Sequence, residues 1–440
     1  MSEPQESIVA PALAASATTL EQRWYVLLMM CLVYTLSIAD RYVVSTVLEP
    51  MRLELRLTDF GIALLTGPAL ALFYVVLGFP LSWLIDRKNR RNIIAVCLVV
   101  WSVMTTLCGK VHSSWQLFGA RMGVGIGEAG GTPGANSLLS DYFPASRRAM
   151  ALTVFSLGAP FGAYVGYSIA GAVADRYGWR DVFFALGVPG VLAGIAVWLT
   201  VREPVRGCLD CPDEEPAPSF LTTMRYLWTQ RSAIHVMIAS AVCALWGWGL
   251  MYWTPTFLQR TYSLTPGAAG ELTGSMHLFG GALATLLTGW LMGTRFMADS
   301  RRIVWLLGIT IGIATLASAV VYYTRDLKLA TVMLWIFIPS IYFYIGPCFG
   351  LLNNLARCKM RAMFCATTLF LANVGNLVIA PNLIGGLSDA FMPHFHGNNV
   401  DSLRLAMLCL VPTGLWATLH YFLAAPAINQ DEARARAFPY

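Results

Sequence analysis

The chain of 440 residues is 57% hydrophobic and only 12% charged, and its formal net charge is +6. Soluble proteins carry charges at about 25% of their positions, so these charges are too few to cover the surface of a water-soluble protein of this length. The high apolar and aromatic content also excludes a disordered chain. The basic residues lie in short clusters between apolar segments, which is typical of membrane proteins rather than of nucleic-acid-binding proteins. We therefore predict a protein that spans a membrane and contacts its lipids, with no nucleic-acid partner.

Twelve apolar segments are long enough to cross a membrane as helices, for which about 20 residues suffice. The first six cover about 24–47, 59–85, 92–111, 115–140, 149–173 and 181–201. The second six cover about 232–258, 267–294, 303–323, 329–355, 361–385 and 403–425. The apolar runs are continuous and do not alternate with a period of two, which favours helices over a membrane β-barrel. The predicted fold class is therefore an all-α membrane protein.

A long polar segment over 202–231 divides these spans into six and six. It contains four prolines and an acidic cluster, which indicates a linker. We expect a six-helix bundle over 24–201 and a second over 232–425, with tails over 1–23 and 426–440. Two related bundles that face each other across a cavity near the membrane midplane are typical of secondary transporters. Within the linker, Ser219 to Trp228 is predicted to form a short amphipathic helix.

The distribution of basic residues predicts the orientation in the membrane. If both ends lie in the cytoplasm, the inner segments hold about twice as many lysines and arginines as the outer ones. The first 23 residues lack the basic start of a cleavable signal peptide, so we expect the first span to be retained. The linker and both tails are then cytoplasmic. Short tails and compact loops favour the inner membrane of a bacterium.

Four charged residues lie inside the predicted spans of the first half: Asp40, Arg41, Arg121 and Glu128. A charge at the centre of a bilayer costs about 2.5–3.5 kcal/mol on insertion scales, so such residues usually have a function. At a rise of about 1.5 Å per residue, Asp40 and Arg121 lie at similar depths in the first and fourth spans. Glu128 lies on nearly the same helix face as Arg121, about 10 Å deeper, within reach of Arg41 from the first span.

We expect these four side chains to form a network of two acids and two bases that lines a polar cavity. A carboxylate whose ionisation depends on such a network can load and release a proton as the network opens. Asp40 and Glu128 are therefore candidates for proton coupling, and no cofactor besides the proton is predicted. The alternative is a static cluster of salt bridges that only holds two helices together.

The loop between the second and third spans reads Ser82-Trp-Leu-Ile-Asp86-Arg87-Lys88-Asn89-Arg90-Arg91. Together with Arg121…Gly125…Gly127 in the fourth span and Gly158-Ala-Pro160-Phe-Gly162 in the fifth, it resembles the motifs of the major facilitator superfamily. The resemblance implies the fold of that superfamily, with a loop acid that holds the cytoplasmic side closed against the second bundle. On this basis the cytoplasmic gate is expected to comprise Asp86, Arg87, Arg90, Arg91, Asp141 and Arg147.

A narrower resemblance rests on the charged motifs. Asp40-Arg41 in the first span, followed by Gly125-Ile-Gly127-Glu128-Ala129 and Asp141-Tyr-Phe143, is similar to the Spinster family of lipid transporters. This resemblance implies the export of an amphipathic lipid such as sphingosine-1-phosphate or a lysophospholipid. It further implies that Arg41 contacts the anionic head group, with Arg121 in the same charge network, while Asp40 and Glu128 carry protons.

The spans of the second half hold fewer charges, and their aromatic and amide residues are the candidates for cavity lining. These candidates are Trp246, Tyr252, Tyr344, Asn373 and Asn376. The aromatic residues fit an interfacial belt equally well, and the asparagines fit hydrogen bonds between helices. Glu271 and His277 near the eighth span are further polar candidates.

Two other patterns are set aside as metal or redox sites. Cys208 and Cys211 form one C-x-x-C pair in the linker, and His394 and His396 stand on the last outer loop. A zinc site needs four ligands, and no second pair lies nearby in either case. We predict no metal and no enzyme activity.

The prediction is thus a monomeric, proton-coupled secondary transporter that moves an amphipathic lipid by alternating access. One alternative is a transporter of the same fold that exports an organic anion or a drug, since the same charges would serve it. Another is an intramembrane enzyme that acts on lipids, with the outer histidines as acid–base groups. A third is a facilitator or scramblase whose flux does not respond to a pH gradient.

Overall fold

The computed structural model describes residues 20–143, 145–204, 219–357 and 360–437, and these residues are almost entirely helical. Within them, ten helices are long and apolar enough to cross a membrane. Two further spans, the second and the fourth, are each divided by a turn into two shorter helices. The prediction of an all-α membrane protein is confirmed. Most of the predicted N-terminal tail and the middle of the predicted linker lie outside the described residues.

The first bundle comprises the first six spans. Their helices are α2 (Leu20–Glu54), α3 (Asp59–Thr66), α4 (Pro68–Arg87), α5 (Arg90–Cys108), α6 (Ser114–Glu128), α7 (Gly131–Tyr142), α8 (Ala145–Ser156), α9 (Gly158–Tyr164), the π-helical turn η2 (Val165–Ile169), α10 (Ala170–Tyr177) and α11 (Trp179–Thr200). A short helix, α12 (Phe220–Thr229), follows in the linker, where Ser219 caps it through the Thr222 N–H. This helix lies where the sequence predicts one.

The second bundle comprises the last six spans. Their helices are α13 (Arg231–Cys243), η3 (Ala244–Trp248), α14 (Gly249–Tyr262), α15 (Pro266–Ser275), η4 (Met276–Gly281), α16 (Ala282–Met292), η5 (Arg295–Ala298), α17 (Ser300–Tyr323), α18 (Leu327–Phe343), α19 (Ile345–Leu355), α20 (Arg361–Asn373), η7 (Val374–Ile379), α21 (Ala380–Phe391), η8 (Met392–Phe395), α22 (Asn399–Leu410) and α23 (Pro412–Ala424). The final helix, α24 (Ile428–Ala437), docks on this bundle, where the Asp431 carboxylate accepts the Ser232 N–H at 2.9 Å.

Interruptions of the helices lie where the bundles meet. The second span bends between Thr66 and Pro68, because proline has no N–H to continue the helical ladder. A Cβ at Gly67 in this bend would lie 2.7 Å from the Leu377 carbonyl oxygen of the opposite bundle. The turns η2, η4 and η7 are π-helical, and each contacts a helix of the opposite bundle. Such turns are rare in proteins overall, and those that occur are often found at functional sites.

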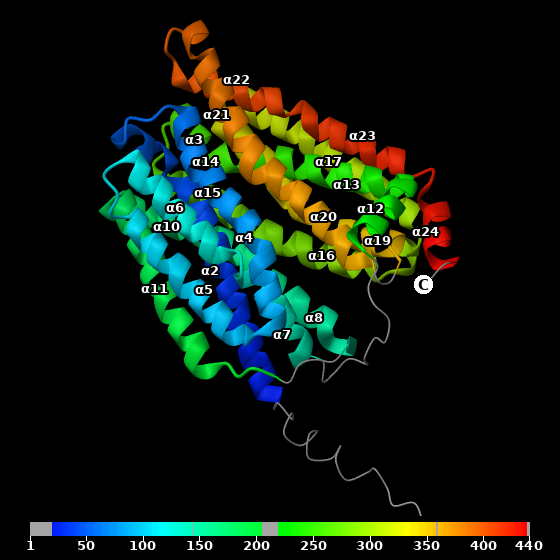
Figure 1. Cartoon of the computed structure of the whole chain (residues 1–440). Helices are drawn as coiled ribbons and strands as arrows, with labels where there is room; N and C mark the ends of the chain where they lie inside the picture. Colours follow the sequence, from blue (N-terminus) through cyan, green and yellow to red (C-terminus); the bar gives the residue numbers. More distant parts are fainter. Residues whose placement is uncertain (1–19, 144, 205–218, 358–359, 438–440) are drawn as a thin grey trace, which may run out of the picture.

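Among the described residues, the two bundles pack on each other mainly towards one face. We call the face on which Leu20 and α24 lie the proximal face and the opposite one the distal face (Figure 1). Towards the distal face, α3 packs on α21 and α10 packs on α15. One cluster of buried apolar side chains runs through the second bundle and the distal part of the first, whereas a separate cluster fills the proximal part of the first bundle. Within the part of the chain that the structure describes, the cluster of buried apolar side chains that the two bundles share therefore lies in the distal half of the first bundle, and the proximal cluster meets the second bundle at Leu377.

Candidate functional site

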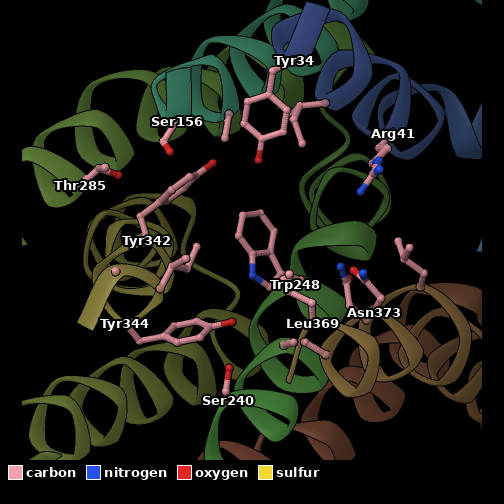
Figure 2. A pocket seen from close by; sticks show the side chains of 18 of the residues that line it. Tyr34, Arg41, Ser156, Ser240, Trp248, Thr285, Tyr342, Tyr344, Leu369 and Asn373 are labelled. Atoms are coloured by element: carbon pink, nitrogen blue, oxygen red, sulfur yellow. The ribbon is translucent and has the colours of Figure 1, made fainter. Parts of the chain in front are cut away.

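A cavity of about 600 Å³ lies between the bundles and is lined by both. Figure 2 shows Tyr34 and Arg41 of the first bundle directed into the hollow, opposite Trp248, Tyr342 and Tyr344 of the second. Its wall extends along the proximal halves of the fifth and eighth spans, where small hydroxyl residues such as Ser156 and Thr285 take part. The wall is mainly aromatic and aliphatic, and its polar side chains include two arginines, two asparagines and several serines and threonines. Such a lining suits a ligand that is largely apolar.

Asp40 and Arg121 form a buried ion pair in the first bundle, and Arg121 also lines the cavity. Arg121 Nη1 lies 2.9 Å from Asp40 Oδ2, and the side chains are 2% and 3% exposed, respectively. The second carboxylate oxygen of Asp40 accepts the Thr105 hydroxyl at 2.5 Å. The pair therefore joins α2, α5 and α6, and each carboxylate oxygen of Asp40 has a fixed donor.

Arg41 and Glu128 form a second ion pair, and this one reaches the cavity. Arg41 Nε and Nη2 both lie 2.9 Å from the same Glu128 oxygen, Oε2. The Arg41 side chain is 21% exposed and lines the cavity, while the Glu128 carboxylate behind it is fully enclosed. Glu128 Oε1 has no hydrogen-bond partner among the described residues. One carboxylate oxygen thus remains available as a proton acceptor, one side chain away from the cavity.

The structure brings together all four charges that the sequence singled out. The depth estimate places Asp40 opposite Arg121, and these two residues do pair. The expected reach of Arg41 to Glu128 is also observed. The sequence could not distinguish the two pairs. Both arginines line the cavity, but Arg41 is more exposed than Arg121. Both Asp40 oxygens have a donor, whereas Glu128 Oε1 has none among the described residues.

The second bundle supplies most of the predicted cavity residues. Tyr252, Tyr344, Asn373 and Asn376 all line the cavity. The prediction for Trp246 is wrong, because its ring is fully buried inside the second bundle. There Trp246 Nε1 donates to Ser318 Oγ at 3.3 Å, and the ring packs on Phe337 with centroids 5.1 Å apart.

Trp248, two residues further on, lines the cavity instead of Trp246. Both tryptophans lie on the π-helical turn η3, in which the ordinary helical period does not hold. The direction of each ring could not be predicted from helical periodicity, because the π-helical turn decides which of the two tryptophans points into the cavity. The sequence therefore indicated the correct segment but the wrong ring.

A cluster of rings closes the distal end of the cavity and was not predicted as a unit. His277 Nδ1 lies 2.7 Å from the Tyr342 hydroxyl, within the second bundle. Its imidazole stacks on Tyr167 of the first bundle with centroids 5.0 Å apart, and Tyr42 lies 5.6 Å from it. His277 was a polar candidate, but nothing in the sequence linked it to the two tyrosines of the other bundle.

Beyond these rings, charged residues close the distal face across the bundle interface. Arg260 of α14 lies 2.5 Å from Glu49 and 2.7 Å from Asp59, and its side chain is only 3% exposed. Arg52 pairs with Glu49 at 2.9 Å within the first bundle. The hydroxyl of Ser388 also donates to Asp59, at 2.7 Å. Sequence reasoning missed this role of Arg260, because a charge near the end of a span resembles any loop charge.

The predicted gate residues at the proximal face make a different set of contacts. Arg90 lies 2.5 Å from Asp141 and 2.7 Å from Glu203, so these three join the third span, the fourth span and the start of the linker. Arg87 stacks over Trp83, with the guanidinium carbon 4.3 Å from the ring centroid.

The remaining gate candidates are peripheral to this group. Arg91 donates to Asn92 at 2.8 Å, and Arg147 is exposed. The side chain of Asp86 lies outside the described part of the structure. Arg90, rather than Arg147, is therefore the ion-pair partner of Asp141 that the structure shows, and Glu203 is a partner that sequence reasoning missed.

No metal site is found among the described residues, since no group of three or more histidine, cysteine or acidic side chains is close enough to hold an ion. His394 and His396 are both exposed on the distal loop. Cys208 and Cys211 lie outside the described residues.

The family model of the major facilitator superfamily matches residues 30–394. The chain belongs to this superfamily. It is therefore a multi-pass secondary transporter and not an enzyme, and the alternative of an intramembrane lipid-modifying enzyme is set aside.

Similar proteins narrow the group. The chain is 29% identical to an MFS-type efflux pump of Mycolicibacterium smegmatis, with 93% of this chain and 94% of the pump covered. The structure of a bacterial homologue of the human lysosomal transporter Spinster, in an inward-facing and unoccupied conformation, matches with a TM-score of 0.85 and 28% identity over 94% of this chain and 99% of that one. The zebrafish (Danio rerio) sphingosine-1-phosphate transporter SPNS2 is 29% identical over 57% of this chain and 54% of its own length. The resemblance to the Spinster proteins that the motifs predicted is confirmed.

Proposed function

We propose that this transporter moves an amphipathic lipid with an anionic head group across the membrane, and that proton uptake by Glu128 is coupled to this movement. The observation that carries the proposal is the Arg41–Glu128 pair, in which a cavity-facing guanidinium covers an enclosed carboxylate, one oxygen of which has no hydrogen-bond partner among the described residues. A phosphate or carboxylate that enters the cavity competes with Glu128 for Arg41, because guanidinium binds such anions strongly. Glu128 then loses its counter-ion inside a low-dielectric wall, where neutralisation by a proton relieves the cost of the charge.

The coupling between proton binding and substrate binding follows from this competition for Arg41. A head group bound to Arg41 and a proton on Glu128 form one state, and the reformed Arg41–Glu128 ion pair forms the other. Because the head group and the proton are loaded in the same state, the substrate and the proton cross the membrane in the same direction. Alternating exposure of the cavity to the two faces then converts a proton gradient into substrate movement.

Asp40 and Arg121 belong to the same proposed network but have a different position in it. Asp40 is held by Thr105 and Arg121 and is separated from the cavity by the Arg121 side chain. We propose that this pair sets the position of α6, and with it the carboxylate of Glu128. Asp40 then shares in coupling through Arg121 when the bundles tilt.

The lining of the cavity favours a lipid tail as the other part of the substrate. Phe349, Leu369 and Tyr344 form an apolar surface in the second bundle, and the cavity extends along the proximal halves of the helices. A head group at Arg41 would leave its chain against these residues. The transporter of zebrafish that resembles this chain is a sphingosine-1-phosphate transporter, which fits the same chemistry.

An organic anion or a drug is the second candidate substrate. It is favoured by the mycobacterial relative, which is an efflux pump and matches this chain along nearly its whole length. The same Arg41 would hold the anionic group of such a compound. In either case we propose a monomer in the bacterial inner membrane, with the proximal face in the cytoplasm and Arg90 and Asp141 in the proximal gate.

A transport assay in liposomes distinguishes these candidates. Purified protein is reconstituted and offered lysophospholipids, sphingoid phosphates and apolar organic anions, with and without an imposed pH gradient. We expect gradient-dependent flux of at least one lipid class, abolished by Glu128→Gln and unchanged by Glu271→Gln, which makes the same substitution at an exposed position of α15. Flux that ignores the gradient would identify a facilitator or scramblase, and flux restricted to the organic anions would overturn the lipid proposal.

A further inference from the structure

At the distal face each bundle contributes an aspartate to the first turn of a helix in the other bundle. Asp389, at the end of α21, accepts the backbone N–H groups of Asp59 and Phe60 at 3.0 and 2.9 Å. These are the first two residues of α3 in the first bundle. In the opposite direction, Asp175 of α10 accepts the Gly267 N–H of α15 at 3.0 Å and the Thr265 hydroxyl at 2.7 Å.

The aspartates complete the capping of both helices. Thr58 caps α3 through the Gly61 N–H, and Thr265 caps α15 through the Ala268 N–H. The threonine leaves the other N–H groups of each first turn without an acceptor in their own bundle, and the aspartate of the opposite bundle accepts these groups. Pro266, the first residue of α15, has no N–H. Neither helix start is fully satisfied by its own bundle.

A sequence repeat underlies the arrangement. A glycine stands four residues before each aspartate, Gly171 before Asp175 and Gly385 before Asp389. A Cβ at Gly171 would lie 2.5 Å from the Pro266 carbonyl oxygen, and one at Gly385 would lie 2.6 Å from that of Asp59. Glycine is needed at both places because the helix backbone touches the capped turn directly.

The two contacts occupy equivalent places in the two bundles. Asp175 and Asp389 lie on the fifth span of their own bundles, and α3 and α15 each begin the second span of theirs (Figure 1). The same device is therefore used twice, once in each direction across the interface. A chance packing contact would not be expected to repeat the glycine, the aspartate and the capping threonine together.

We infer that these crossed helix caps form a distal latch that stabilises the conformation closed at the distal face. A carboxylate at a helix N-terminus gains from its hydrogen bonds and from the positive end of the helix dipole. When the bundles tilt and the distal face opens, both caps separate and water replaces them, so their contribution exists only in the closed state. Asp175 and Asp389 are then positioning residues of the transport cycle, which bias the equilibrium without touching substrate.

The latch rests on the alternating access of the superfamily and not on the identity of the substrate, so its test needs neither lipid nor pH gradient. Spin labels are placed on the distal loops at Lys110 of the first bundle and His394 of the second, both of which are exposed. The distance distribution between them reports the distal-open fraction in detergent or nanodiscs. The variants are Asp175→Ala, Asp389→Ala and the double variant.

We expect each single variant to favour the distal-open state by about fivefold and the double variant by about twentyfold or more, since a helix cap contributes that much to an equilibrium. Asp326→Ala is the matched control. Asp326 also caps a helix near the distal face, accepting the Lys328 N–H at 2.9 Å, but the cap and α18 belong to the same bundle. Its removal should leave the distance distribution unchanged.

Asparagine variants keep the test decisive if the alanine variants do not fold, because Asn caps a helix without the charge and should give a smaller shift in the same direction. Gly385→Val should shift the distribution as well, while Gly119→Val, whose added Cβ would meet nothing within 4 Å, should not. Distances in the double variant that match the unmodified protein, or that shift equally in Asp326→Ala, would overturn the latch.

Discussion

The buried pair of Asp40 and Arg121 makes a quantitative prediction about stability. Arg121→Gln leaves the Asp40 carboxylate enclosed, with the Thr105 hydroxyl at 2.5 Å as its remaining donor. Removing one partner of a buried ion pair costs about 3–5 kcal/mol, because the other charge stays buried without compensation. We therefore expect Arg121→Gln and Asp40→Asn each to lower the free energy of unfolding by about 3 kcal/mol.

The double variant should recover part of this loss. With Asn at position 40 and Gln at position 121, no charge remains to be desolvated, and two amides can hydrogen-bond to each other. The expected coupling energy is at least about 2 kcal/mol, well above the uncertainty of additive effects. Reversible unfolding of all four proteins in mixed micelles, followed by circular dichroism, measures each term of the cycle.

A surface pair serves as the control for this cycle. Arg180 and Glu54 lie 2.5 Å apart, but their side chains are 27% and 51% exposed. Exposed ion pairs contribute about 0–1 kcal/mol, so the corresponding cycle should show a small coupling energy. Additive effects of Asp40→Asn and Arg121→Gln, within about 0.5 kcal/mol, would refute the reasoning that these two charges depend on each other.

Three further predictions concern the distal closure and the cavity. Arg260→Gln should favour the distal-open state by about thirtyfold, since a buried, hydrogen-bonded charge pair across the interface is lost; the spin-label distances check this, and an unchanged distribution would contradict it. Gly346→Leu should leave folding intact, because an added Cβ at this position meets nothing within 4 Å. The larger side chain should narrow the cavity, so that long-chain substrates are transported less than short-chain ones. An equal loss of transport for all chain lengths would argue against a lipid tail at this wall. Trp246→Ala should destabilise the protein by about 3–5 kcal/mol, because a large buried side chain is lost. Trp248→Ala should instead reduce substrate affinity, with less effect on stability. Unfolding and binding titrations of both variants measure these two effects.

The fold could be predicted from the sequence because the membrane imposes a simple rule on length and polarity. Each span shows as about 20 apolar residues, and the polar linker separates six from six. The interruptions of the helices within the spans were harder to predict from the sequence. Pro68 marks the bend of the second span, but the π-helical turns at Val165–Ile169 and Val374–Ile379 follow from packing against the other bundle, which no local pattern encodes.

The charged part of the site was predictable for a related reason. A charge within a span is expensive, so Asp40, Arg41, Arg121 and Glu128 stand out, and the helical rise alone relates their depths. Charges at span ends carry no such penalty.

The position of Arg260, Asp175 and Asp389 at the bundle interface was therefore not predicted. The two tryptophans of η3 illustrate the same limit at a smaller scale. Which of them faces the cavity depends on a helical irregularity that tertiary packing sets, so Trp246 was assigned wrongly.

The proposal that Glu128 carries the driving proton is tested most directly by comparing two assays on Glu128→Gln in liposomes. One measures exchange of labelled substrate between equal internal and external pools without a pH gradient, and the other measures accumulation driven by a gradient. Because glutamine fills the same space and cannot ionise, we predict that exchange persists while gradient-driven accumulation is lost. Accumulation that still follows the gradient in Glu128→Gln, at the level of the unmodified protein, would contradict the account.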